Sequence, residues 1–205
     1  MKEPLLTSRL APLPLTQWPR ERKEALAPVT PPTPRPEGTP KGLNVLGMFA
    51  HHPALARAFH LLVAHLLYET TLSARQREII ILRVGARRDA YYEWAQHVVL
   101  GQEAGLSRTE IAALSGDAEV TWTPLEAALV KAVDELVADA NVTDGTWAAL
   151  TDGLTEQQVL DVICTVGGYD LLAMLMRSTG IRLDDDLRAW IDSYRSAGAE
   201  ASPER

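Results

Sequence analysis

Two carboxylates and one imidazole stand close together in the sequence, at Glu78, Glu93 and His97. Glu93 and His97 are four residues apart, so in a helix they would lie on the same face. Glu78 belongs to the preceding helical segment, which a short loop would return antiparallel to the second one. The three side chains could therefore meet in one cleft.

This set of side chains is compatible with three kinds of site. An imidazole has a suitable pKa for acid–base catalysis near neutral pH, and a neighbouring carboxylate could orient it. One nitrogen and two carboxylates could instead hold zinc, iron or manganese. In the third case, Glu93 and His97 form an ordinary surface pair on a helix. Glu78 interrupts an apolar stretch, and because a buried carboxylate needs a partner, we expect it to contact Arg75, Arg83 or His97.

Aromatic side chains flank the pair and could wall a binding pocket. Tyr91, Tyr92 and Trp94 combine apolar rings with polar tips, which suits a small substrate. They could equally be core or subunit-interface residues. We predict that Tyr92, Trp94 and Arg83 bind the substrate.

Helix signals surround these residues. Ser73 and Gln76 have the spacing of a capping box, which predicts a helix that runs from there towards Gly85. Asp89 is predicted to cap the next helix, which would carry Glu93 and His97. Similar signals predict helices that begin near Pro53, Ser107, Thr123, Thr143 or Asp144, Thr155 and Asp184. No segment shows the alternation of a β-strand, so we predict an all-α protein.

A weak internal repeat is visible at an offset of about 82 residues. Leu-Ser-Ala-Arg-Gln, which begins at Leu72, matches Leu-Thr-Glu-Gln-Gln, which begins at Leu154. The repeat predicts a possible duplicated helical hairpin. Leu160 stands in the second copy where Glu78 stands in the first, so any chemistry belongs to the first copy.

Composition divides the chain into three parts. Residues 1–42 hold most of the prolines, whose density excludes regular helix except near residues 20–27. Their leucines and Trp18 are too apolar for a purely solvated tail, so we predict an extended arm that wraps its own domain or a neighbouring subunit. Residues 43–195 are predicted to form the helical domain, and residues 196–205 a flexible tail.

Charge and cysteine content exclude several classes of protein. The 205-residue chain has a formal net charge of −7 and no Lys/Arg-rich block, which argues against nucleic-acid and membrane partners. Cys164, the only cysteine, cannot form an intrachain disulfide and is predicted to be a buried apolar residue. No signal pattern and no apolar run of about 18 residues is apparent, so we expect a soluble, cytoplasmic protein.

The segment REIIILRVGARRDAYYEWAQHVVLGQEAGLSRTEI resembles the core motif of the carboxymuconolactone decarboxylase family, within the alkyl hydroperoxidase D-like superfamily. The likeness extends from about residue 43 to residue 187 and includes TVGGYDLLAMLMRSTGIRLDDDL. It implies an all-α fold built around a helical hairpin. It also implies that the chain is a homo-oligomer, a trimer or a hexamer.

The peroxidase-like branch of the superfamily has two cysteines three residues apart, with a histidine four residues after the second. A glutamate lies on its preceding helix. Glu78 and His97 match that glutamate and that histidine, but Ala90 and Glu93 stand where the cysteines would be. Without a thiolate to attack the peroxide, the motif argues against thiol-dependent peroxide reduction.

The decarboxylase branch also keeps the histidine, so the resemblance implies a cofactor-free lyase. Its substrate would be a small carboxylated lactone or a related acid. His97 would transfer the proton, Glu93 would orient His97, and Glu78 would act as a second acid/base or polarise the substrate. One alternative is a metal-dependent enzyme that uses all three residues. Another is a non-catalytic binding or assembly protein, for which no substrate pocket beside His97 is expected.

Overall fold

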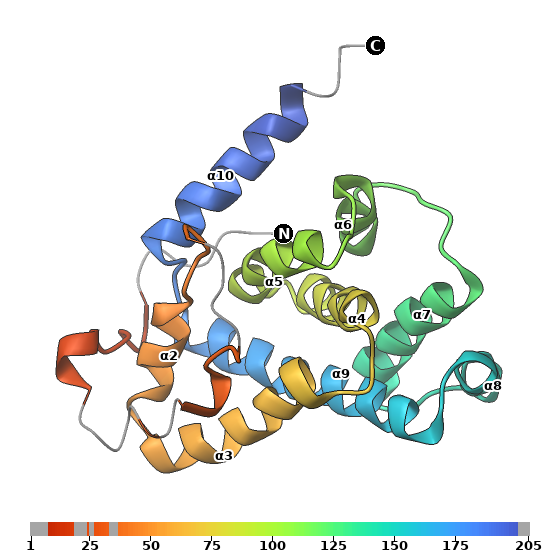
Figure 1. The fold of residues 1–205 in the computed structure, drawn as a ribbon, viewed down its shortest axis with the longest axis horizontal. Helices are drawn as coiled ribbons and strands as arrows, with labels where there is room; N and C mark the ends of the chain where they lie inside the picture. The colour runs from red at the N-terminus through yellow and green to blue at the C-terminus, as the bar shows by residue number, and fades with distance from the viewer. Residues whose placement is uncertain (1–7, 19–23, 25–26, 33–36, 201–205) are drawn as a thin grey trace.

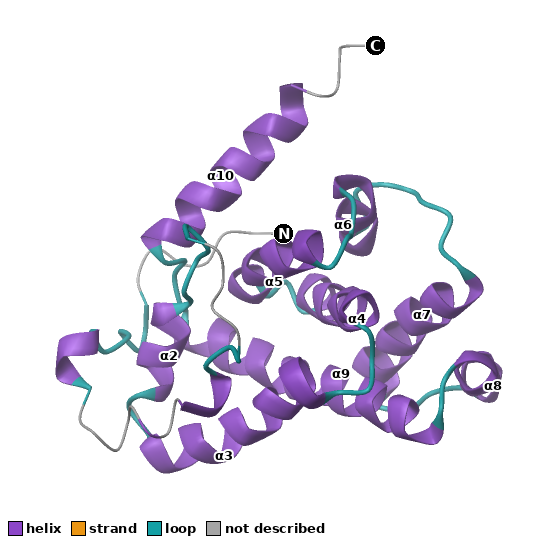
Figure 2. Ribbon diagram, viewed as in Figure 1, coloured by secondary structure: helices purple, strands orange, loops and turns teal. Residues whose placement is uncertain are grey.

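The computed structural model describes residues 8–18, 24, 27–32 and 37–200. Within these ranges every regular element is a helix, which confirms the all-α prediction (Figure 2). Short 3-10 turns, η1 (Leu15–Gln17) and η2 (Ala27–Val29), precede the first labelled helix, and a π-helical turn, η3 (His65–Glu69), extends α3. The α-helices are α2 (Leu43–Phe49), α3 (Pro53–Ala64), α4 (Ala74–Arg87), α5 (Tyr91–Glu103), α6 (Arg108–Ser115), α7 (Pro124–Asp139), α8 (Asp144–Gly153), α9 (Glu156–Thr179) and α10 (Asp185–Glu200).

Capping boxes start four of these helices, as the sequence predicts. Ser73, Ser107, Thr123 and Thr155 each accept a hydrogen bond from the third residue of the following helix, whose side chain bonds back to the cap. Helix α5 is different, because its N-cap is Ala90, which has no side chain that can accept a hydrogen bond. The prediction that Asp89 caps α5 is therefore wrong. Asp89 has a φ of 52° and makes the tight turn out of α4 instead.

Helix α4 lies in the middle of the molecule and packs against α5, α6, α7 and α9 (Figure 1). Its apolar run, residues 79–82, is fully buried in the core, which explains why so apolar a segment is helical rather than extended. Helix α9 runs below α4 and α5 across much of the molecule. This arrangement places one face of α4, one face of α5 and one face of α9 against each other.

The segments that match in the internal repeat begin α4 and α9, and both helices start at a capping box. The two helices nevertheless present the matched position differently. Glu78 has no exposed surface, whereas Leu160 is 62% exposed. The likeness therefore extends to the helix starts but not to the side chain that carries the chemistry.

The described part of the N-terminal arm lies against its own domain. The backbone N–H of Arg9 donates to Thr179 O at the end of α9 (2.7 Å), and that of Leu13 donates to Gly47 O in α2 (3.0 Å). Further along, the Tyr68 hydroxyl donates to Val29 O (3.1 Å). Most of the predicted short helix near residues 20–27 lies outside the described residues.

The C-terminal boundary differs from the prediction. Helix α10 continues through Glu200, five residues beyond the expected end of the helical domain at residue 195. Residues 201–205 lie outside the described residues.

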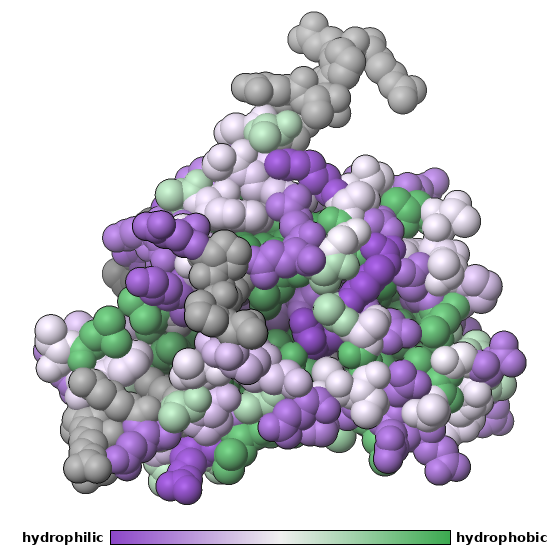
Figure 3. Space-filling view, in the orientation of Figure 1, coloured by the Kyte–Doolittle hydropathy of each residue, from purple (hydrophilic) through white to green (hydrophobic). Residues whose placement is uncertain are grey.

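Helix α9 is long and apolar enough to cross a membrane by length and composition alone, which the sequence analysis did not anticipate. However, 56% of its apolar window is buried inside the molecule, as in the core helix of a soluble protein. Hydrophilic and hydrophobic side chains are interspersed over the face seen in Figure 3 rather than separated into a continuous belt. Packing accounts for the buried part of this apolar character, whereas Leu160, Leu171 and Met174 of α9 are exposed.

Candidate active site

The centre of the candidate site is a buried pair formed by Glu78 of α4 and His97 of α5. Glu78 Oε2 lies 2.7 Å from His97 Nδ1, and Glu78 Oε1 accepts a hydrogen bond from Arg77 Nε at 3.0 Å. Because a carboxylate only accepts hydrogen bonds, Nδ1 carries the proton of the ring. Glu78 therefore fixes both the tautomer and the orientation of the imidazole, and Nε2 is the ring nitrogen left for a ligand.

Glu93 does not orient His97, so that prediction is wrong. Both carboxyl oxygens of Glu93 are buried and have no hydrogen-bond partner among the described residues. Burial raises the pKa of Glu93 well above the ordinary value, and the charge of Asp170 raises it further. Burial therefore favours the neutral carboxylic acid form of Glu93, which can donate a hydrogen bond.

A cavity of about 180 Å³ opens beside the pair. Glu93, Gln96 and His97 line it from α5, and the ring of Tyr169 from α9 meets the His97 ring edge-on at 5.0 Å between centroids. The rest of the lining is mostly apolar and comes from α2, α3 and α9, including Phe49, Phe59 and Leu172. The non-catalytic alternative expected no pocket here, so the cavity counts against it.

The arm closes one side of this cavity. Val29 and Lys41 belong to its lining, although Lys41 is exposed to solvent. The apolar interior therefore ends at a rim that carries a positive charge. This arrangement suits a ligand with an apolar body and an anionic end.

Of the predicted substrate-binding residues, Tyr92 alone lines the cavity. Its hydroxyl donates to Asp184 Oδ2 at 2.5 Å. Burial, followed by the charge of Asp184, raises the pKa of Tyr92 well above the ordinary value. Tyr92 is therefore a neutral phenol that ties α5 to the segment before α10.

Trp94 and Arg83 do not line this cavity, so the structure does not bring them to the candidate site. Trp94 is buried and stacks on Tyr91, with ring centroids 6.3 Å apart. Arg83 makes two hydrogen bonds of 2.8 Å to the Asp134 carboxylate and one to Leu114 O. Arg83 thus joins α4 to α6 and α7 rather than facing the cavity.

Three lining residues escaped the sequence analysis. Gln96 precedes His97 in the recognised motif, and its place one turn after Glu93 is a signal that could have found it. Tyr169 and His60 come from α9 and α3, which only tertiary packing brings to the site. No local pattern distinguishes them from other buried residues.

The metal-binding alternative does not fit this geometry. Across the described ranges, no three His, Cys, Asp or Glu side chains are arranged to hold a metal ion. Glu78 is instead satisfied by Arg77 and His97. Cys164 is exposed on α9, contrary to the prediction that it is buried, and it does not line the cavity.

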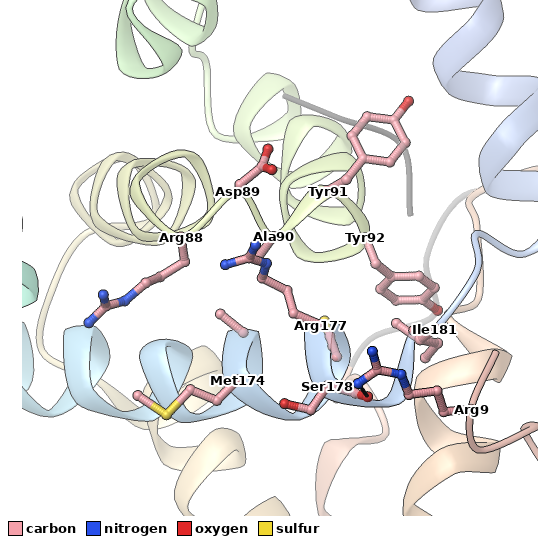
Figure 4. Close-up of a pocket in the computed structure, with 13 residues that line it drawn as sticks. Arg9, Arg88, Asp89, Ala90, Tyr91, Tyr92, Met174, Arg177, Ser178 and Ile181 are labelled. Atoms are coloured by element: carbon pink, nitrogen blue, oxygen red, sulfur yellow. Dashed lines mark hydrogen bonds between the residues drawn. The ribbon is translucent and has the colours of Figure 1, made fainter. Parts of the chain in front are cut away.

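A second, larger cavity of about 520 Å³ lies at the other side of Tyr92 (Figure 4). Arg9, Arg88 and Arg177 contribute to it from the arm, the end of α4 and the end of α9. The Arg88 guanidinium is engaged by both oxygens of Asp170 and by Val137 O. His97 and Glu93 do not line this cavity, so it is separate from the candidate active site.

Comparison with known proteins identifies related sequences and folds. Residues 53–135 match the carboxymuconolactone decarboxylase family. No curated protein matches the chain. Among solved structures, a peroxidase-related protein from Silicibacter has a TM-score of 0.71 at 16% identity, and the match covers 91% of this chain and 97% of that one.

Two other solved structures are similar over most of their length. An alkylhydroperoxidase AhpD-core protein from Ralstonia eutropha has a TM-score of 0.70 at 17% identity, with 88% of this chain and 96% of that one covered. The debrominase Bmp8 has a TM-score of 0.69 at 13% identity, with 92% and 98% covered. At these identities the structures establish a shared fold and not a shared reaction.

Proposed function

We propose that the protein is a lyase that removes CO₂ from a small carboxylated lactone or a related acid, because residues 53–135 match the carboxymuconolactone decarboxylase family and the chain shares the fold of AhpD-like proteins. The observation that carries the proposal is the Glu78–His97 pair, which orients an imidazole at the wall of a mostly apolar cavity. A cytoplasmic location, as expected from the sequence, remains part of this proposal.

The reaction breaks the bond between the ring carbon and its carboxylate. CO₂ leaves, and the electron pair that remains delocalises onto the ring carbonyl oxygen as an enolate. His97 takes a proton from solvent on Nε2 and becomes an imidazolium, which the Glu78 carboxylate stabilises. Nε2 then delivers this proton to carbon, and the ring returns to the neutral form that carries its proton on Nδ1. The product is an enol lactone, and no oxidant, reductant or thiol takes part.

The surroundings of His97 support this assignment in two ways. An apolar cavity disfavours the charged carboxylate relative to neutral CO₂, so water exclusion assists the bond cleavage. Lys41 at the rim can hold an anionic group during entry. The cysteine positions of the peroxidase-like motif are occupied by Ala90 and Glu93, so the same cavity offers no thiolate for peroxide chemistry.

Turnover of 4-carboxymuconolactone by the purified protein tests the proposal. We expect the wild type to consume the lactone and His97→Ala to lose this activity with an unchanged oligomeric mass. His65→Ala is the matched control, because His65 contacts Asp161 outside the cavity. An inactive wild type would reject this reaction, and equal activity in His97→Ala would reject the role of the imidazole.

A further inference from the structure

The His97 cavity contains buried polar atoms that no protein group satisfies. Both oxygens of Glu93 and Nε2 of Gln96 lack a hydrogen-bond partner among the described residues. The two residues are three apart on α5, so their side chains are neighbours on one face of that helix. Buried polar groups are nearly always paired in folded proteins, and an unpaired set beside a cavity indicates a ligand that completes it.

The nearest protein group does not satisfy Gln96. Its Nε2 lies close to the Tyr92 hydroxyl, as shown by their shared proximity to Gly42. That hydroxyl already donates to Asp184 and accepts from the Val45 N–H. The Gln96 amide is near enough to lower the pKa of Tyr92, but the contact falls outside ordinary hydrogen-bond geometry. Since an amide NH₂ has two N–H groups, at least one is left for the cavity.

Both orphan groups can act as donors. An amide NH₂ only donates, and a protonated carboxyl has one O–H to give. Glu93 is fully buried and has no cation bonded to it among the described residues, and both conditions raise its pKa and favour the protonated form. The partner they require is therefore an acceptor oxygen with two lone pairs.

The size of the cavity limits what can carry that oxygen. Apolar cavities of about 150 Å³ accept benzene, so about 180 Å³ accommodates one ring with a small substituent. We propose that Glu93 and Gln96 form a carbonyl-binding subsite, which takes the ring carbonyl of a single-ring ligand beside His97 Nε2. This inference rests on the proposed function, because it names the oxygen on which the enolate would form.

The subsite gives Glu93 and Gln96 a catalytic role. As CO₂ leaves, negative charge accumulates on the carbonyl oxygen, and two preorganised donors in a mostly apolar site stabilise that charge. A neutral carboxylic acid is suited to this task, as in other enzymes that keep a buried carboxyl protonated at neutral pH. His97 on the next turn of α5 then reaches the ring carbon rather than the oxygen.

Equilibrium binding tests the subsite without turnover. The probes are acetophenone and ethylbenzene, which have similar size and differ in the carbonyl oxygen, measured by ligand-detected NMR. We expect wild-type protein to bind acetophenone about tenfold more tightly, the difference made by one or two neutral hydrogen bonds. Gln96→Leu should lose most of this preference. Glu93→Gln should keep it, because an amide still donates.

The pH dependence separates Glu93 from a merely structural residue. As the pH rises through the raised pKa of Glu93, the wild type should lose its preference for acetophenone because a carboxylate repels the carbonyl oxygen. Glu93→Gln should show no such change. The conservative variant thus removes the titration and retains the donor.

The outcomes distinguish this inference from the proposed function. Equal binding of the two probes by the wild type, or no binding of either, would overturn the subsite even if the lactone is consumed. A preference for acetophenone that survives in Gln96→Leu would overturn the role of Gln96. Selective binding of acetophenone without lactone turnover would retain the subsite and reject the decarboxylase.

Discussion

Glu78 and His97 lie on different helices, and their side chains meet at 2.7 Å in the core of the molecule. The carboxylate is completely buried and the imidazole is 7% exposed. Arg77 holds the other carboxylate oxygen and so fixes Glu78, and the ring cannot rotate without breaking its buried hydrogen bond to Glu78. The pair is therefore a rigid support for Nε2.

Glu78→Gln should impair this support while preserving the shape of the side chain. The amide has one acceptor and one donor end, so it cannot accept from Arg77 and His97 together. We expect turnover of a confirmed substrate to fall by about 10²-fold or more, the usual contribution of a positioned acid/base. Steady-state kinetics with the folded variant, verified by circular dichroism, measures this.

The matched control is Asp134→Asn, which weakens an ion pair that α4 makes through Arg83 on the side away from the cavity. This variant should lose stability and keep its turnover. Equal losses of turnover in both variants would indicate general damage to α4 and contradict the positioning role of Glu78.

The Arg75–Glu110 pair predicts an acid-sensitive contribution to stability. Its hydrogen bond lowers the pKa of Glu110 to about 2, and a bond from Arg75 to Glu126 extends the network. The unfolded chain, with a carboxyl pKa of about 4.3, binds more protons than the native chain in the interval between these values. The stabilisation is therefore complete above about pH 4.3 and is lost as the pH falls through about 2.

Arg75→Met should remove this dependence and lower the free energy of unfolding at neutral pH by about 2 kcal/mol or less, because the groups are partly exposed. Urea unfolding at neutral pH and at about pH 3 provides the measurement. The variant and the wild type should differ at neutral pH and converge in acid. If the free energy of unfolding changes with pH in the same way in the variant and in the wild type, Arg75 does not set the pKa of Glu110.

Local signals predicted the helices, and tertiary packing decided the contacts of the site. The capping boxes at Ser73 and Thr155 place α4 and α9 correctly because a cap depends on only four adjacent residues. The spacing of Glu93 and His97 predicted that they share a face, but not that α4 would supply the partner of the imidazole. In the packed structure Glu93 lines the cavity, and the Glu78 carboxylate is the hydrogen-bond partner of His97.

The same limit explains the other errors. Trp94 and Arg83 were assigned to the site because they are close to it in sequence, whereas Tyr169 comes from α9, which is remote in the chain. The position of the arm also had no sequence signal, because proline-rich segments carry no periodicity that reveals what they contact.

Gly47→Ala should displace the arm from α2. A Cβ at this position would lie 2.6 Å from Leu13 O and 2.9 Å from Pro12 Cβ, and the first of these atoms is backbone. The hydrogen bond from Leu13 N to Gly47 O cannot survive that shift. We expect cleavage of the segment 8–18 by limited proteolysis to be several-fold faster than in the wild type.

Gly145→Ala is the matched control, since an added Cβ meets nothing within 4 Å. This change in α8 should leave proteolysis of the arm unchanged and raise stability by roughly 0.5–1 kcal/mol. If the arm is cleaved no faster in Gly47→Ala than in the wild type, the contact with α2 does not hold the arm in place.

The exposed face of α9 predicts association with a second copy of this chain. Leu160, Cys164, Gly167, Leu171 and Met174 follow one another at alternating spacings of three and four residues, and the three large side chains are 62%, 46% and 52% exposed. This is the apolar pattern with which one helix packs against another. Exposed leucines of α3 adjoin the stripe, because Leu62 lies 4.0 Å from the Cβ position of Gly168.

We therefore expect a homo-oligomer in solution, which light scattering coupled to size-exclusion chromatography would measure as a multiple of 22.5 kDa. The double variant Leu160→Glu, Leu171→Glu should dissociate, because it places charges on the stripe that association would bury. Trp147→Glu, which changes an exposed apolar residue of α8, should not. Alkylation of Cys164 should be slow in the wild type and fast in the double variant. A monomeric wild type with rapidly alkylated Cys164 would contradict pairing through this face.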